Sequence, residues 1–231
     1  MPVKSRSHFS VPYLCGAAMF SREAFKTETS STGATNDASV LAHRAHVVSA
    51  ITSSAAALEA MINEAFVDAV ESDGGCIAAV SPETRTNMAA LWEIPCISRC
   101  AILDKFNIAH LLIAGRTLDK SHHRWRNVSW VVRLRNDFVH FEPSWQHHDT
   151  SGGLAPPPPV NGYEKYEKGV KGLFEENRMC GAGNPFYPDK MLGHGCAEWS
   201  LRSALEFSDH FWKSIGVVPA YDSYRQFLTT R

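Results

Sequence analysis

The sequence has no long apolar run and no excess of charge of either sign. No stretch reaches the roughly 18 apolar residues that a membrane-spanning helix needs, so we expect no membrane span. Lysine and arginine total 23 against 24 aspartate and glutamate residues, which leaves a formal net charge of -1. This balance excludes a uniformly basic nucleic-acid binder. It leaves room for a local basic patch, because the field in a cleft depends on the charges that line it.

Export signals and cysteine motifs are also missing. Pro12 interrupts the loosely apolar residues 11–20, and no continuous apolar segment precedes a small-residue cleavage site. The six cysteines include no Cys-x-x-Cys pair. Three disulfides would suit a small secreted protein, but this chain is long. We therefore expect reduced thiols, a cytoplasmic location and a poorly ordered start.

Strand signals are nearly absent, whereas helical periodicity is strong. The only short β-type run, Val217-Val218, ends at Pro219. The longest periodic segment begins with an N-cap at Asn36 or Asp37 and ends near Gly74. One helix of about 35 residues would be about 50 Å long, which suits a helical bundle better than a compact α/β domain.

Further helices follow from capping and stop signals. Ser81-Pro82-Glu83 is a good helix start, Pro95 predicts a first turn or a kink, and Gly115 is a plausible residue just past a helix end. A third long helix begins at Asp119 or Ser121 and is stopped by Pro143. A short helix over 163–177 and a strong one over 197–215 complete the pattern, while His194 between two glycines is expected in a loop.

These signals predict an all-α fold, an up-and-down bundle of four to five helices with a Pro-rich insertion after the third long helix. Residues 144–162 contain four consecutive prolines, which favour an extended, mobile surface segment. We predict one helical domain over 37–215, preceded by an N-terminal extension (1–36) and followed by a C-terminal tail (216–231).

The segment most indicative of chemistry is Arg133–Phe141, at the end of the third long helix. It contains a guanidinium, an amide and an imidazole at Arg135, Asn136 and His140. At about 100° per residue, Asn136 and His140 share a face, whereas Arg135 and His140 lie about 140° apart. The Arg135 and His140 side chains converge only through the long arginine side chain, distortion at the helix end, or a second copy of the segment. The last option predicts a two-fold dimer with a composite pocket.

This set of groups suits cleavage of a phosphodiester in RNA. A histidine titrates near neutral pH and can take the proton from a ribose 2′-hydroxyl. An arginine can hold a phosphate through two hydrogen bonds and stabilise the charge that grows on phosphorus. The scheme needs neither a metal nor a cofactor, and it spares DNA, which lacks the 2′-hydroxyl nucleophile.

The spacing Arg135-Asn136-x-x-x-His140, in a core helix that ends before a proline, resembles the Arg-(four to six residues)-His motif of HEPN domains (higher eukaryotes and prokaryotes nucleotide-binding). The polar residue directly after the arginine fits that motif. The segment 57–66 is similar to the long first helix of many HEPN proteins. The resemblance covers residues 37–142 and, more weakly, the last helix.

Membership of that family would imply an up-and-down helical bundle, usually dimeric, and in many members a metal-independent endoribonuclease. Its members act in toxin–antitoxin, phage-defence and RNA-processing systems. The resemblance therefore implies RNA as substrate, a homodimer, and an antitoxin or regulatory protein as a further partner. Arg135 and His140 would be catalytic and Asn136 would position them. The Pro-rich insertion and the N-terminal extension depart from the family pattern.

Other interpretations stay open. The domain could be a non-catalytic HEPN-like module that binds RNA, a nucleotide or a protein, or a purely structural dimer. His140 could simply cap its helix, because the helix dipole stabilises a positive charge at that end. The supporting candidates could be partners of the motif or ordinary surface residues: Arg133, Asp137, Glu59 and Asn63. The adjacent histidine pairs 122–123 and 147–148 lack other ligands at zinc spacing, so we expect no metal site.

Overall fold

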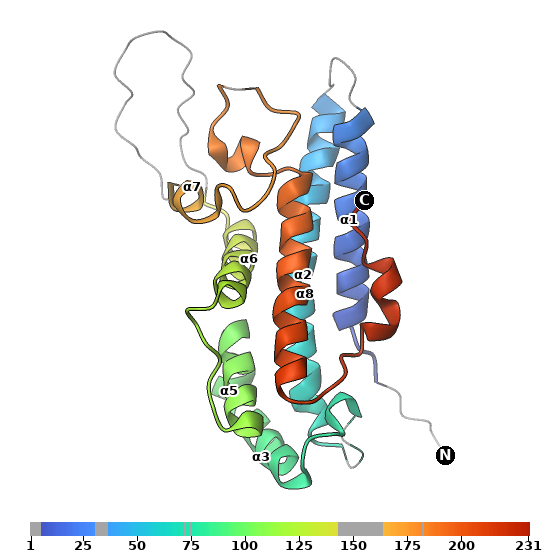
Figure 1. Cartoon of the computed structure of the whole chain (residues 1–231), viewed down its shortest axis with the longest axis vertical. Coiled ribbons are helices and arrows are strands. Elements are labelled where there is room, and N and C mark those ends of the chain that lie inside the picture. The colour runs from blue at the N-terminus through green and yellow to red at the C-terminus, as the bar shows by residue number, and fades with distance from the viewer. Residues whose placement is uncertain (1–5, 31–36, 72, 74, 143–163, 182) are drawn as a thin grey trace.

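The computed structural model describes residues 6–30, 37–71, 73, 75–142, 164–181 and 183–231 (Figure 1). Over these residues the regular structure is entirely helical, without a strand, which confirms the all-α prediction. The Pro-rich segment 144–162 lies outside the described residues.

Three long helices lie side by side and form the body of the molecule (Figure 1): α1 (Ser10–Ser30), α2 (Asp37–Asp68) and α8 (His194–Ser214). Two more helices follow one another along the α2 and α8 pair, α5 (Ile102–Ala114) and α6 (His123–Val139). The remaining elements are short: η1 (Gly75–Ile77), α3 (Pro82–Trp92), α4 (Pro95–Ser98), α7 (Glu164–Val170), η2 (Phe186–Lys190) and η3 (Asp222–Phe227).

Several helix boundaries follow from local chemistry. The Ser81 hydroxyl accepts a hydrogen bond from the Thr84 backbone N–H and caps α3, and Gly115 ends α5 with a left-handed φ of 70°. By contrast, α6 begins at His123, later than predicted, because the His122 ring accepts a hydrogen bond from the Arg124 N–H and caps the helix. Helix α7 is shorter than the predicted helix over 163–177, and α8 begins at His194, which the sequence placed in a loop.

The N-terminal part of the chain departs most from expectation. Residues 10–30, assigned to an extension, form α1 and bury Leu14, Ala17 and Ala18 completely in the core. Pro12 is compatible with this helix because it lies in the first turn, where its missing N–H has no partner within the helix.

Helix α2 runs through the centre of the protein and contributes to both apolar clusters of the core. One cluster contains Leu58, Ile62 and Phe66 of α2, and the other contains Val47 and Ile51. By length and composition α2 is the one described helix apolar enough to cross a membrane, although the sequence has no long apolar run. Half of the apolar window is buried inside the protein, as in the core helix of a bundle.

The C-terminal segment is also packed against the body. Tyr221 is buried, and its hydroxyl donates a 2.7 Å hydrogen bond to Asp209 of α8. Leu228 belongs to the same apolar cluster as Leu14. Residues 216–231, assigned to a polar tail, therefore contribute to the core.

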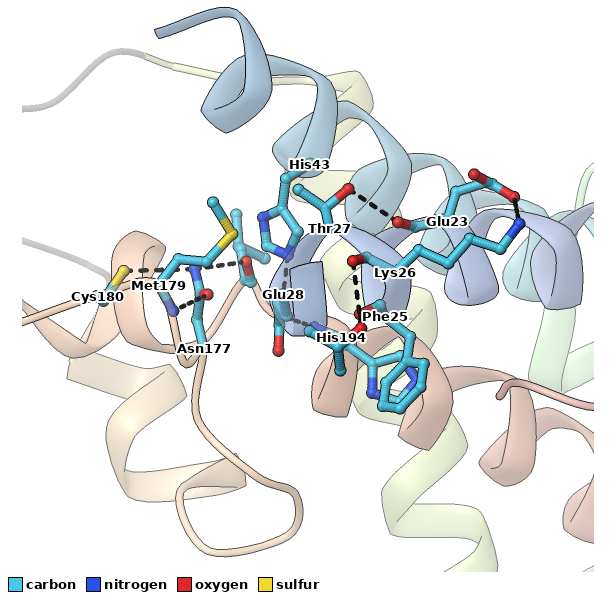
Figure 2. Close-up of polar contacts among 12 residues, drawn as sticks. Glu23, Phe25, Lys26, Thr27, Glu28, His43, Asn177, Met179, Cys180 and His194 are labelled. Carbon is cyan, nitrogen blue, oxygen red and sulfur yellow. Dashed lines mark hydrogen bonds and ion pairs between the residues drawn. The ribbon is translucent and has the colours of Figure 1, made fainter. Parts of the chain in front are cut away.

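The buried carboxylate of Glu28 on one segment makes polar contacts with two other segments at one end of the bundle. Glu28 of α1 lies 2.8 Å from Nε2 of His43 on α2, and it accepts a 2.6 Å hydrogen bond from the backbone N–H of His194 (Figure 2). Both side chains of the pair are almost completely buried. Burial alone would raise the pKa of Glu28, but the hydrogen bonds from His43 and His194 outweigh it and lower the pKa.

This contact predicts that His43→Leu is strongly destabilising. The substitution leaves the Glu28 carboxylate buried without its imidazole partner, which costs about 3 kcal/mol or more. For a chain of this length we expect the melting temperature to fall by roughly 6–12 °C. His123→Leu, at an exposed position on α6, is the control and should change it by less than about 2 °C.

The same contact predicts a pH dependence. The folded-state pKa of Glu28 is depressed, so its stabilising contribution is present above the unfolded value, about 4.3, and is lost as pH falls through the folded value. The stability difference between the wild type and Glu28→Gln should therefore shrink as pH falls below about 4.5. A difference that stays constant from pH 7 to pH 3 in urea denaturation would contradict this account.

Candidate functional site

The guanidinium of Arg135 is fixed by contacts from two helices. Its Nη2 lies 2.7 Å from Oε2 of Glu59 on α2, and its Nη1 donates a 3.0 Å hydrogen bond to Oδ1 of Asn136. About a third of each charged side chain is exposed, so the ion pair itself contributes only about 0–1 kcal/mol to stability. Because a guanidinium has five N–H donors, these contacts leave capacity for a phosphate.

A second polar contact lies one turn further along α2. Nζ of Lys105 on α5 donates a 2.9 Å hydrogen bond to Oδ1 of Asn63, and the ammonium lies 5.7 Å from the ring centroid of Trp92. Lys105 is only 1% exposed. Burial lowers its pKa, and the charge of Glu59 opposes that shift. Because Glu59 and Asn63 are four residues apart, one face of α2 connects Lys105 to Arg135.

This arrangement predicts that two substitutions differ in their effect on the free energy of unfolding. Asn63→Leu removes the acceptor but keeps the buried ammonium, so we expect a loss of about 2–3 kcal/mol in the free energy of unfolding. Lys105→Met removes the charge and keeps a similar apolar volume, so we expect a change within about 1 kcal/mol. Urea denaturation of both variants measures the two values. Equal losses in the free energy of unfolding for the two variants would contradict a buried Lys105 charge that depends on Asn63 as its hydrogen-bond acceptor.

The other supporting candidates face elsewhere. Asp137 accepts a 2.7 Å hydrogen bond from Nζ of Lys165 and a second one from the hydroxyl of the buried Tyr166, so it attaches α7 to α6. Arg133 packs over the ring of Trp130, with the guanidinium carbon 4.6 Å from the ring centroid. Of the four supporting candidates, only Glu59 contacts Arg135 directly within the described residues.

His140 lies at the exposed end of α6. It is the C-cap residue, and its backbone N–H donates a 2.9 Å hydrogen bond to the carbonyl of Asn136. Its side chain is exposed, as are its neighbours Val139 and Phe141, which are each 57% exposed. The helix therefore ends with an imidazole accessible to solvent, five residues after the fixed guanidinium.

Lys105 is a candidate functional residue that was not predicted from the sequence. It lies in an apolar helical run, where a lysine ordinarily faces solvent. The available signal is its position: Ile102, Lys105, Phe106 and Ala109 follow helical spacing, and all four are buried. A buried lysine with a lowered pKa beside Glu59 and Asn63 marks this region as a candidate functional site.

In chemical terms, the contact between α2 and α6 offers a partly exposed guanidinium, and the end of α6 offers an exposed imidazole. The guanidinium can hold an anion, and the imidazole can accept or donate a proton. The chain matches no known protein-family model, and no curated protein or solved structure is significantly similar to it.

Proposed function

We propose that the protein is a metal-independent endoribonuclease of HEPN type, with its active site at the C-terminal end of α6. The observation that carries the proposal is the position of Arg135, fixed by Glu59 and Asn136, five residues before an exposed His140. The sequence spacing and this arrangement of charge support the same chemistry.

In the proposed reaction His140 acts as the general base. It takes the proton from a ribose 2′-hydroxyl, and the resulting oxygen attacks the adjacent phosphorus. The bond from phosphorus to the 5′-oxygen breaks, and this oxygen takes a proton from water or from a second, protonated imidazole and leaves as a 5′-hydroxyl. The other product ends in a 2′,3′-cyclic phosphate. Arg135 stabilises the extra negative charge on the phosphoryl oxygens as the 2′-oxygen attacks.

Asn136 and Glu59 are positioning residues in this proposal. Asn136 accepts a hydrogen bond from one terminal nitrogen of Arg135, and Glu59 pairs with the other. Together they restrict the rotamers of a flexible side chain, so less conformational entropy is lost when a phosphate binds.

The proposal also has an architectural part. The long helices form an up-and-down bundle of four to five helices, and a second copy of the chain places its own α6 end beside the first. His140 of the partner subunit could then protonate the leaving 5′-oxygen. In solution the dimer would have about twice the 25.6 kDa chain mass. A cytoplasmic toxin or defence effector, controlled by an antitoxin or regulatory protein, is the setting that the family resemblance suggests.

The test is incubation of the purified protein with total RNA in excess EDTA, beside single-stranded DNA under the same conditions. We expect RNA cleavage that EDTA does not inhibit and intact DNA. Binding of RNA without cleavage would instead favour the non-catalytic module.

A further inference from the structure

An apolar hollow with aromatic walls lies beside the end of α6. Phe138 contributes from α6 and Phe141 from just beyond its end, Tyr187 from η2, and Arg44 and Val48 from the first part of α2. The cavity volume is about 300 Å³. This size is at the low end of pockets that hold small ligands, so it suits one planar ring system and not two.

The hollow adjoins the proposed active site along both helices. Phe138 on α6 lies three residues after Arg135, and Phe141 directly follows His140, the residue that caps α6. On α2, Arg44 and Val48 precede Glu59 at helical spacing, through positions 52 and 55, and so share a face with it. The rise from Val48 to Glu59 is about 16 Å at 1.5 Å per residue.

Arg44 places a guanidinium at the rim of the hollow, and an ion pair with Asp189 fixes its position. Nη2 of Arg44 lies 2.8 Å from Oδ1 of Asp189, and the Arg44 side chain remains 43% exposed. Phe141 is more than half exposed beside it. Exposed aromatic faces next to an arginine are the combination on which single-stranded nucleic acids stack their bases.

We propose that this hollow binds one nucleobase of the same single-stranded RNA whose phosphodiester Arg135 and His140 act on. The inference rests on the proposed function, because it takes RNA as the substrate. The base stacks on Phe141, and the Arg44 guanidinium lies at the edge of the ring system. The hollow thereby sets which phosphodiester reaches His140.

The test uses a short 2′-O-methyl RNA that contains one 2-aminopurine, whose fluorescence falls on stacking. This RNA has no free 2′-hydroxyl, so binding is measured apart from cleavage. We expect the wild type to quench the fluorescence and Phe141→Ala to bind roughly 5- to 20-fold more weakly, as expected for the loss of one partly exposed stack. Val48→Trp, which fills the hollow, should remove the quenching. Phe227→Ala is the matched control, because Phe227 is 54% exposed on η3.

The possible outcomes test base binding in the hollow separately from RNA cleavage. Wild-type and Phe141→Ala proteins that bind this RNA equally, or a wild type that does not bind it, would overturn the base-binding proposal. A raised KM for total RNA in Phe141→Ala with kcat within about twofold supports it. If the protein binds through Phe141 but cleaves no RNA, the hollow is retained and the endoribonuclease proposal fails. If the protein cleaves RNA and Phe141→Ala leaves KM unchanged, the endoribonuclease proposal is retained and the base-binding proposal fails.

Discussion

His140→Ala should slow RNA cleavage by about 10²- to 10⁴-fold, the usual contribution of a positioned acid–base group. The loss follows from the removal of the imidazole that takes the 2′-hydroxyl proton. The fold should be unaffected, because the side chain is exposed and the helix-ending hydrogen bond to Asn136 comes from the backbone N–H, which alanine keeps. The melting temperature should change by less than about 2 °C.

His123→Ala is the control for this prediction. It removes an exposed histidine from the opposite end of the same helix and should leave the cleavage rate unchanged. If His140 only stabilises the end of α6 through the helix dipole, His140→Ala would lower the melting temperature and leave cleavage intact. A folded His140→Ala protein with full activity would exclude the proposed base.

Arg135→Ala should lower kcat by about 10²- to 10³-fold through the loss of charge stabilisation at the phosphoryl oxygens. The stability cost should be at most about 1 kcal/mol, because the pair with Glu59 is partly exposed to solvent. Arg135→Lys should recover only part of the rate, since an ammonium does not offer the paired donors of a guanidinium. Single-turnover kinetics on total RNA measures these rates.

Glu59→Ala distinguishes a catalytic arginine from a structural ion pair. It removes the same ion pair but keeps the guanidinium, so we expect a loss in kcat of no more than about tenfold with little change in KM. If Glu59→Ala and Arg135→Ala reduce the rate equally, the ion pair itself would be the functional unit and direct phosphate contact by Arg135 would be excluded.

The helices that are specified by local chemistry could be predicted from the sequence. The Ser81 cap and the Gly115 end each depend on residues a few positions apart. The end of α6 is nearly as local, because Pro143 lies a few residues past its last turn.

Helix α1 could not be predicted this way because its cap comes from another part of the chain. The Glu64 carboxylate of α2 accepts hydrogen bonds from the backbone N–H groups of Phe9 and Ser10 and from the Ser10 hydroxyl. No residue near Ser10 signals this partner, which is 54 positions away. The same limit applies to Glu28 and His43, whose contact joins two helices across a polar connection.

The same distinction between local sequence features and contacts of distant segments applies to the candidate site. The Arg135 and His140 spacing is visible in the sequence, as is the shared face of Glu59 and Asn63 on α2. The contact of Glu59 with Arg135 and the burial of Lys105 depend on how α2, α5 and α6 pack. Periodicity identifies which residues share a face, but it does not identify the helix that covers the face.

Metal-independent RNA cleavage with His140 as the general base is tested most directly by the chemistry of the RNA ends that wild-type protein and His140→Ala, purified in parallel, produce in excess EDTA. We expect fragments with 2′,3′-cyclic phosphate and 5′-hydroxyl ends from the wild type, and a cleavage rate at least about 10²-fold lower from the variant. Fragments with 3′-hydroxyl ends, cleavage that EDTA abolishes, or equal cleavage by both proteins would contradict this mechanism.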